Sequence, residues 1–402
     1  MRKVLPLAFL FLSTTVLAQT QVVNLTAAPK VFIMDADAVA QAKRKYDQKD
    51  KATLQLVDSL RKRADALLNM KNLSVMDKGF TPPSGSKHDY MSQAPYFWYD
   101  STKPNGLPYI RRDGEHNPEI KKISDHDNLS ALDIAVRTLA LTYYITRDER
   151  YAAKAAGLLH YWFFDDATKM NPNLEFAQGI PGITTGRGIG IIETRSLTGI
   201  ADAVGLLSNS KSWTTTDTKQ LQQWYSQYLN WMLNSKNGKE EHRAKNNHGT
   251  WFFVQSIDFA LFTGDNAKAL QLVNESKIRL DSQITKEGKF PLELERTNAL
   301  GYSTFNTAAW FQVAKLAENL NVDLWHFKTS KNAGLQTAVD WLTPYALKEK
   351  KWTYQQIGGY NANEFYPLLL QSANKFHDAN YLKKANEIPK KSVDPITELL
   401  YR

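Results

Sequence analysis

Three polar residues, Asn246, Asn247 and His248, stand directly before a long apolar stretch that begins at Gly249. This position is typical of a helix N-terminus, where free backbone N–H groups can bind a negative charge. Amide and imidazole side chains also donate hydrogen bonds, so Asn247 and His248 could together bind a carboxylate. The alternative is a capping asparagine followed by a histidine whose hydrogen bonds are satisfied inside the protein.

A second group of polar residues lies between Glu293 and Ser303. It contains a permanent cation, Arg296, and a phenol, Tyr302, six positions apart. Gly301 would permit an unusual backbone angle next to the tyrosine. Such a pair could transfer protons, but a tyrosine that only makes a hydrogen bond across the fold would give the same pattern.

A third segment, from Lys87 to Trp98, combines aromatic residues with donors such as His88 and Gln93. Aromatic faces stack on sugar rings, while Lys, His and Gln can donate hydrogen bonds to carboxylates and hydroxyls. The alternative is that these aromatic side chains only attach a loop to the body of the protein.

The elements that must position these segments are helices. Apolar residues recur at spacings of three and four residues along most of the chain, which predicts about ten buried helix faces and few strands. The expected helices span about 38–68, 129–143, 150–162, 190–207, 217–233, 249–262, 266–280, 303–320, 332–347 and 363–376.

Two segments between the helices, 81–118 and 171–190, are longer than a compact helical domain usually needs. Long loops often carry function. No Pro-, Gly- or Ser-rich linker divides the chain after its leader, so we expect a single domain over residues 19–402. Successive helical hairpins favour an all-α (α/α) barrel, or toroid, whose long loops cover one end. An irregular helical bundle is the alternative.

The N-terminus has the pattern of a secretory signal peptide. Arg2 and Lys3 precede an apolar run from Val4 to Leu17, and Val16 to Ala18 form a small-residue cleavage pattern before Gln19. We therefore expect residues 1–18 to be removed and the protein to be periplasmic or secreted. No later stretch is apolar enough to predict insertion into a membrane.

Composition excludes several classes of protein. The 402 residues contain no cysteine, which rules out disulfides, thiolate metal sites and a cysteine nucleophile. The formal charge is +9, and without Arg2 and Lys3 it is +7. This excess favours an anionic partner, although it could also serve solubility alone. The basic pairs are scattered, so we expect no nucleic-acid partner and favour an acidic polysaccharide.

We expect neither a metal ion nor another cofactor. His126 lies between Asp125 and Asp127, but a helix start rich in aspartate explains that pattern. The sequence has no His-Glu-x-x-His motif and no EF-hand spacing. The glycine-rich segment from Gly186 to Gly190 does not follow a strand, so it does not predict a phosphate-binding loop.

Taken in order, these segments resemble the alginate lyase family of polysaccharide lyases, which are exported (α/α) toroids. The matching segments are 87–96, 106–114, 246–251 and 296–302. The resemblance implies cleavage of a 4-linked polyuronate by β-elimination, which requires no metal. It also implies that Asn247 and His248 neutralise the uronate carboxylate. Tyr302 would move the protons, and Arg296 would keep the phenol partly ionised.

On mannuronate and glucuronate, the C5 hydrogen and the leaving O4 share one face of the ring, so a single phenol could serve both steps. On guluronate a second group, such as His248, would be the base. We expect alginate with mannuronate-type linkages to be the substrate. Candidate contacts to neighbouring sugars are Lys87, His88, Tyr90, Gln93, Tyr96, Trp98 and Arg195. Arg195 could instead form a buried ion pair with Glu193.

The sequence departs from the family at Trp98-Tyr99-Asp100, where a second Trp and a Pro are usual, and in segment 171–190. A glucuronan lyase and a non-catalytic polyuronate-binding protein therefore stay open. So does an inverting glycoside hydrolase, which would need two carboxylates across a cleft. Glu293 or Glu295 with Asp89 is the pairing that the sequence offers.

Overall fold

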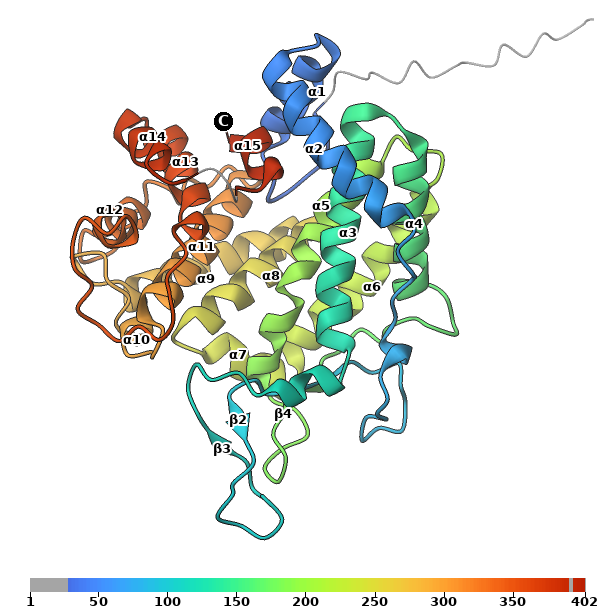
Figure 1. The fold of residues 1–402 in the computed structure, drawn as a ribbon, viewed down its shortest axis with the longest axis vertical. Helices are drawn as coiled ribbons and strands as arrows, with labels where there is room; N and C mark the ends of the chain where they lie inside the picture. Colours follow the sequence, from blue (N-terminus) through green and yellow to red (C-terminus); the bar gives the residue numbers. More distant parts are fainter. Residues whose placement is uncertain (1–27, 390–392, 402) are drawn as a thin grey trace, which may run out of the picture.

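The computed structural model describes residues 28–389 and 393–401, and these residues form a mainly helical protein (Figure 1). The expected signal peptide lies outside the described residues. The helices that form the body are α1 (Ala36–Asp47), α2 (Lys51–Leu68), α3 (Asp125–Thr146), α4 (Glu149–Phe163), α5 (Leu197–Leu207), α6 (Thr215–Asn234), α7 (Lys236–Arg243), α8 (Asn247–Thr263), α9 (Asn266–Gln283), α10 (Pro291–Leu294), α11 (Ala299–Glu318), α12 (Leu335–Ala346), α13 (Tyr366–Lys375), α14 (Ala379–Asn386) and α15 (Pro395–Tyr401).

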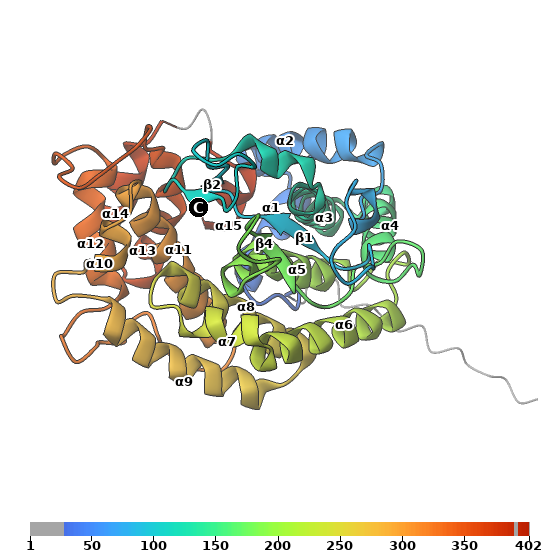
Figure 2. The ribbon, with the colours of Figure 1, turned by 90° about the horizontal axis from the view of Figure 1, so that it is seen from below.

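The helices follow one another in a ring. An inner row runs through α3, α5, α8 and α11, each packed against the next. From α11 the contacts continue through α12, α13 and α15 to α2, which packs on α3 and closes the circuit. The outer helices α4, α6 and α9 cover the inner row (Figure 2). This arrangement is the helical toroid that the succession of helical hairpins favoured over an irregular bundle.

Helix α8 is the centre of the fold. Every residue from Gly249 to Phe262 is buried, because α5, α6, α9 and α11 surround the helix. A sequence that is apolar on all sides is the expected composition of such a helix. The amide of Asn246 caps its start by accepting from the backbone N–H of His248, and Gly264 ends it at φ 85°. Asn247 and His248 therefore belong to the first turn of a rigid element.

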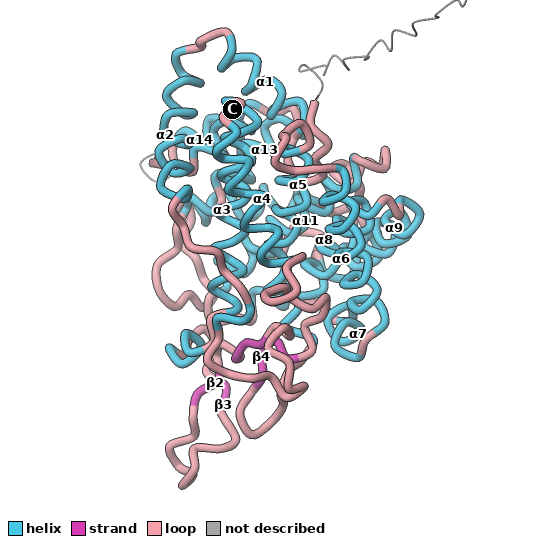
Figure 3. The backbone as a smooth tube through the Cα atoms, turned by 90° about the vertical axis from the view of Figure 1, so that its right-hand side faces the viewer, coloured by secondary structure: helices cyan, strands magenta, loops and turns pink. Residues whose placement is uncertain are grey.

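Short strands and long loops gather at one end of the helical body (Figure 3). Strand β1 (Met91–Gln93) pairs in parallel with β4 (Phe176–Gly179), which joins the two long segments 81–118 and 171–190. Strands β2 (Phe97–Trp98) and β3 (Ile110–Arg111) form an antiparallel hairpin. The 3₁₀ helices η1 (Val75–Asp77), η2 (Pro118–Lys122), η3 (Gly188–Ser196) and η4 (Ala362–Glu364) connect these parts.

Several expected helix boundaries were wrong. The helix expected over 38–68 is two helices, because Lys49 adopts a left-handed φ of 60° and Asp50 caps a new start. The helix expected from 190 begins with the 3₁₀ segment η3. Helix α13 begins at Tyr366, with Pro367 in its first turn. In the part of the chain that is described, no helix is both long enough and apolar enough to cross a membrane.

Candidate active site

A cavity of about 880 Å³ opens at the end of the body where the strands and long loops lie. Its walls come from the segment around β1 and β2, from η2 and η3, from the start of α8 and from the start of α11. It brings together seven of the residues selected from the sequence. These are Gln93, Tyr96, Arg195, Asn247, His248, Arg296 and Tyr302.

Asn247 is held in place by a buried glutamate. Its backbone N–H donates to Oε1 of Glu293 at 2.6 Å, and its side-chain Nδ2 donates to Oε2 at 2.7 Å. Both residues are almost fully buried, with 0% of Asn247 and 1% of Glu293 exposed. The helix cap is Asn246, so the side chain of Asn247 is not used for capping. The capping asparagine of the alternative interpretation is thus Asn246, and Asn247 has a different partner.

His248 is oriented by a second buried glutamate. Its Nδ1 lies 2.8 Å from Oε1 of Glu241, which belongs to α7. A carboxylate can only accept, so the imidazole hydrogen is on Nδ1 and Nε2 is free for another partner. The neighbouring Gly249 has no room for a side chain, since a Cβ there would lie 2.0 Å from the carbonyl oxygen of Ala244. The segment before α8 can therefore pass close to this turn.

The phenol of Tyr302 lies between two groups. Its hydroxyl is 2.7 Å from the hydroxyl of Tyr96, and the guanidinium carbon of Arg296 lies 3.7 Å from the centre of its ring. Burial and the hydrogen bond with Tyr96 raise the pKa of Tyr302, and the charge of Arg296 offsets this only in part. The expectation that Arg296 keeps Tyr302 partly ionised was therefore wrong for the free protein.

Arg296 is not a free cation, because it forms a two-point ion pair with Asp113. Its Nη2 donates to Oδ1 at 2.7 Å and its Nε to Oδ2 at 3.1 Å. Burial disfavours the Asp113 carboxylate, but hydrogen bonds from Arg296 and from the backbone N–H of Thr297 outweigh this and lower its pKa. Asp113 follows β3, so this pair attaches the long segment 81–118 to the start of α11. Gly301, which was expected to take an unusual angle, is an ordinary residue of α11.

Two other arginines of the cavity have no carboxylate partner among the described residues. Arg187 donates to Oε1 of Gln178 at 2.8 Å, and Arg195 donates to the carbonyl oxygen of Ile192 at 3.1 Å. Burial lowers the pKa of both guanidinium groups, although this leaves them charged at neutral pH. The proposed ion pair between Arg195 and Glu193 does not form. The cavity therefore contains positive charge that an anionic ligand could neutralise.

Four residues that the sequence suggested as sugar contacts do not line the cavity. The side chain of Tyr90 is fully buried and donates to Glu193 at 2.8 Å. Nδ1 of His88 lies 2.7 Å from the carbonyl oxygen of Lys169, and Nε1 of Trp98 donates to the carbonyl oxygen of Glu115 at 3.0 Å. Lys87 also lies outside the cavity. The alternative given for this segment, that its side chains attach a loop to the body of the protein, therefore describes these residues better than a role in sugar binding.

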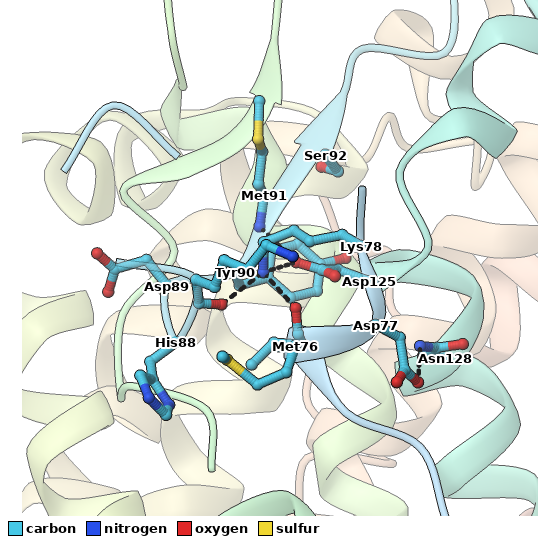
Figure 4. Close-up of polar contacts among 12 residues, drawn as sticks. Met76, Asp77, Lys78, His88, Asp89, Tyr90, Met91, Ser92, Asp125 and Asn128 are labelled. Carbon is cyan, nitrogen blue, oxygen red and sulfur yellow. Dashed lines mark hydrogen bonds and ion pairs between the residues drawn. The ribbon is translucent and has the colours of Figure 1, made fainter. Parts of the chain in front are cut away.

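The attachment of this segment depends on a buried ion pair, shown in Figure 4. Nζ of Lys78 lies 2.9 Å from Oδ2 of Asp125, with both side chains 0% exposed. The same ammonium donates to the carbonyl oxygen of Lys87 at 2.7 Å, and Oδ2 of Asp125 accepts from the backbone N–H of Met91 at 2.9 Å. The pair thus fixes the start of β1 on α3, and β1 leads to Gln93 and Tyr96 in the cavity.

Sequence reasoning missed two residues of the site. Arg187 was considered only as part of a glycine-rich segment, although an arginine in a long loop is itself a signal for anion binding. Glu241 gave no such signal, because its importance depends on what the fold brings to it. Glu193 was considered only as a partner of Arg195, whereas it accepts hydrogen bonds from Tyr90 and Ser92. In the part of the chain that is described, no three His, Asp or Glu side chains gather as a metal site would require. The carboxylates that the sequence offered for a glycoside hydrolase do not line the cavity; these are Asp89, Glu293 and Glu295. Their positions argue against the hydrolase alternative, which needs two carboxylates facing each other across a cleft.

Comparisons with known proteins identify the family and the fold. A family model described as Alginate lyase matches residues 74–352. An alginate lyase from Bacteroides ovatus is 38% identical and has a TM-score of 0.89, over 93% of this chain and 99% of that chain. Alginate lyase A1-III from a Sphingomonas species is 16% identical, with a TM-score of 0.58 over 94% of this chain and 98% of that chain.

A variant of alginate lyase A1-III complexed with a tetrasaccharide is 15% identical, with a TM-score of 0.59 over 94% of this chain and 98% of that chain. At such identities the two A1-III structures compare the fold alone. The search among curated proteins gave no match.

Proposed function

This chain belongs to the alginate lyase family and is a polysaccharide lyase, and from that premise we propose that it cleaves mannuronate-rich alginate by β-elimination. The observation that carries the proposal is the convergence of Asn247, His248 and Tyr302 on one cavity that also contains unpaired arginines. These groups match the two tasks of the reaction, which are to neutralise a carboxylate and to move a proton.

The first task falls to the start of α8. The C5 hydrogen of a uronate is too weakly acidic to be removed while the adjacent carboxylate keeps its full charge. Donors that meet this carboxylate stabilise the enolate-like charge that develops, and each such donor can contribute roughly 3 to 4 kcal/mol. We assign this role to Asn247 and to His248 in its doubly protonated form, because only then does Nε2 carry a hydrogen to donate while Nδ1 donates to Glu241.

The second task falls to Tyr302. On mannuronate the same phenol takes the C5 proton and returns it to O4, because both lie on one face of the ring. Its raised pKa means that the phenol must first lose its own proton. The hydroxyl of Tyr96, 2.7 Å away, can accept that proton while it releases its own to solvent, so that the proton leaves by a relay and Tyr96 stays neutral. On guluronate, His248 would remove the proton from the opposite face.

Arg187 and Arg195 are assigned to the carboxylates of neighbouring sugars. Both guanidinium groups line the cavity without an ion pair to a described residue. A polyuronate carries one carboxylate per sugar, so it can supply the missing charges. Arg296 differs from them, because Asp113 already neutralises it.

A substrate panel tests the proposed function. Purified protein is incubated with polymannuronate, polyguluronate and glucuronan, and the ultraviolet absorbance of the conjugated 4,5-double bond is followed. We expect the fastest rise with polymannuronate. Faster cleavage of glucuronan, which differs from polymannuronate only at C2, would identify a glucuronan lyase, and binding without products would identify a non-catalytic protein. Asn247→Ala and His248→Ala should abolish the signal while the far-ultraviolet circular dichroism stays unchanged.

We also propose that the protein acts in the periplasm or outside the cell, because residues 1–18 have the pattern of a signal peptide. N-terminal sequencing of the protein from cell fractions tests this. We expect the mature chain to begin at Gln19 in the periplasmic or extracellular fraction. An intact N-terminus in the cytoplasmic fraction would contradict the proposal.

A further inference from the structure

Glu293 uses both carboxylate oxygens to bind one residue, Asn247, at 2.6 and 2.7 Å. It has no ion-pair partner among the described residues, since Arg296 pairs with Asp113 and His248 pairs with Glu241. A carboxylate that is 1% exposed and unpaired is costly unless it has a role that requires it. Its position directly behind the amide of Asn247 suggests what that role is.

The amide of Asn247 is turned the wrong way for a carboxylate ligand. Because an ionised carboxylate can only accept hydrogen bonds, Glu293 holds Nδ2 toward itself. The other atom of the amide, Oδ1, is buried and has no donor among the described residues. Asn247 lines the cavity, and the atom of its amide that is not bound to Glu293 is an acceptor, whereas a uronate carboxylate needs a donor. An unsatisfied buried acceptor of this kind requires an explanation.

We propose that Glu293 takes up a proton from solvent when a uronate carboxylate enters the cavity, and that the amide of Asn247 then turns over. In the turned state, the new O–H of Glu293 donates to Oδ1 of Asn247, and Nδ2 presents its hydrogens to the substrate carboxylate. The backbone N–H of Asn247 continues to donate to Oε1. When the product leaves, the proton returns to solvent and the amide turns back. This inference rests on the proposed binding of a uronate beside Asn247.

The surroundings of Glu293 allow it to take up a proton near neutral pH. Burial raises the pKa of Glu293 to about 6, against the hydrogen bonds from Asn247 and the charges of Arg296 and His248. The helix α11, on which α10 packs, contributes Tyr302, whose hydroxyl is bound to Tyr96. A second carboxylate close by would raise this pKa further, because like charges disfavour ionisation. Near neutral pH the free protein is then mainly ionised at this site and the complex is protonated.

The sign of the pH dependence follows from proton linkage. A group that gains a proton on binding favours the complex at low pH. The affinity should therefore fall as the pH rises above about 6, by at most about tenfold per pH unit for one proton. His248 lies nearby and could contribute to the same dependence, so a variant must isolate the share of Glu293.

The experiment uses the full chain with Tyr302→Phe, so that the ligand is not cleaved, and a mannuronate tetrasaccharide as the probe. Isothermal titration calorimetry at pH 7, in two buffers of different ionisation enthalpy, measures the protons taken up. We expect an uptake of up to about one proton. Adding Glu293→Gln should reduce the uptake and flatten the pH dependence between pH 6 and 8. The glutamine amide can donate to Oδ1 and accept from the backbone N–H, as a protonated glutamate would.

Glu295→Gln in the same background is the matched control, because Glu295 is an exposed residue two positions away. It should behave as the Tyr302→Phe parent does. Equal proton uptake in the Glu293→Gln variant would overturn the proposal. So would a tenfold or larger loss of affinity in that variant at pH 6, since the protonated form should be the one that binds.

If Glu293→Gln does not fold, infrared difference spectroscopy of the Tyr302→Phe protein labelled with ¹³C-glutamate gives a second test. The tetrasaccharide should produce a protonated carboxyl band with the isotope shift of the protein, and its absence would overturn the proposal. A failure here differs from a failure of the proposed function. In the latter case, the protein with Tyr302 intact would not form unsaturated products from polymannuronate at all.

Discussion

At the scale of single residues, the site is defined by how each group is held. Glu293 fixes Asn247, Glu241 fixes His248, and Tyr96 binds the hydroxyl of Tyr302. The three groups that act on the sugar therefore each have one dedicated partner. For His248 and Tyr302 these partners fix the position of the group before the substrate arrives, which is what makes preorganised groups effective in the transition state. Asn247 differs, because in our proposal its amide turns over when the substrate binds.

Replacement of the phenol tests the proton transfer. Tyr302→Phe should lower kcat on polymannuronate by about two to four decades, which is the usual contribution of general acid–base catalysis, while the oligosaccharide still binds. Initial rates from ultraviolet absorbance and a binding titration measure the two effects. Near-normal turnover in the variant would show that another group moves the proton.

The pH dependence of turnover gives a second check on the same residue. Since the pKa of Tyr302 is raised, the ionised phenol is a minor form at neutral pH. Its amount should increase by up to about tenfold per pH unit. We therefore expect kcat on polymannuronate to rise between about pH 7 and 9. A kcat that falls over this range would contradict the assignment of Tyr302 as the base.

The unpaired arginines should contribute to binding rather than to chemistry. Arg187→Met removes a cation that, in the proposal, meets a substrate carboxylate. We expect KM to rise by roughly tenfold or more, because hydrogen bonds between charged groups contribute about 1.5 to 3 kcal/mol, while kcat changes little. Arg137→Met is the control, since Arg137 pairs with Asp133 away from the cavity. An unchanged KM in Arg187→Met would refute the role of this residue.

At the scale of elements, two features position the site. Helix α8 is buried along its length and delivers Asn247 and His248 from its first turn. Strand β1 is fixed on α3 by the Lys78–Asp125 pair (Figure 4). The strand leads to Gln93 and Tyr96, which line the cavity. Burial raises the pKa of Asp125 to about 6 despite the charge of Lys78, so the carboxylate depends on its partner.

Removal of that partner should destabilise the protein strongly. Lys78→Met leaves Asp125 buried without a cation, which typically costs about 3 to 5 kcal/mol. Lys121→Met breaks an exposed pair with Asp127, which typically contributes about 0 to 1 kcal/mol. Thermal unfolding of both variants provides the comparison. Equal shifts of the unfolding midpoint would mean that the buried pair does not fix β1.

A second carboxyl group makes the stability of α8 depend on pH. Asp258 is fully buried and neither of its oxygens has a partner among the described residues, so burial raises its pKa well above the usual value. The pKa of Asp258 is higher in the folded protein than in the unfolded chain. The contribution of the protonated carboxyl group to stability is therefore fully present below about pH 4, the usual pKa of an aspartate, and is lost as the pH rises through the higher pKa of the folded protein. The slope for one such group is at most about 1.4 kcal/mol per pH unit.

Asp258→Asn should therefore raise the thermal unfolding midpoint more at pH 7 than at pH 5. Asp58→Asn, on the exposed face of α2, is the control and should leave both midpoints nearly unchanged. A gain from Asp258→Asn that is larger at pH 5 would have the wrong sign and would show that the buried carboxyl group is ionised and stabilised by some other partner.

At the scale of the whole molecule, the sequence predicts the inner helices well and the site in part. Most residues after His248 are apolar, which is the pattern of a buried helix, and α8 is buried from Gly249 to Phe262 even at its polar residues. Helix α7 was missed because its eight residues are mostly polar and pack through only Asn237, Gly238 and Glu241. The role of Glu241 could not be predicted for the same reason, since only the tertiary fold brings it to His248.

The aromatic segment shows the opposite error. Its composition suggests sugar contacts, but Tyr90 and Trp98 make hydrogen bonds within the protein, while Gln93 and Tyr96 line the cavity. Composition alone cannot distinguish these groups, because only the tertiary fold decides which side chains of the segment face the cavity. The net positive charge does not show where on the protein an anionic ligand would bind. The fold shows it, because Arg187 and Arg195 line one cavity without a carboxylate partner among the described residues.

The central claim is that this protein breaks a polyuronate by elimination rather than by hydrolysis. Cleavage of polymannuronate in water enriched in oxygen-18, followed by mass spectrometry of the products, tests it most directly. Elimination adds no water across the broken bond, so we expect unsaturated ends and no heavy oxygen incorporated at the moment of cleavage. Saturated products that carry one heavy oxygen per broken linkage would contradict the account.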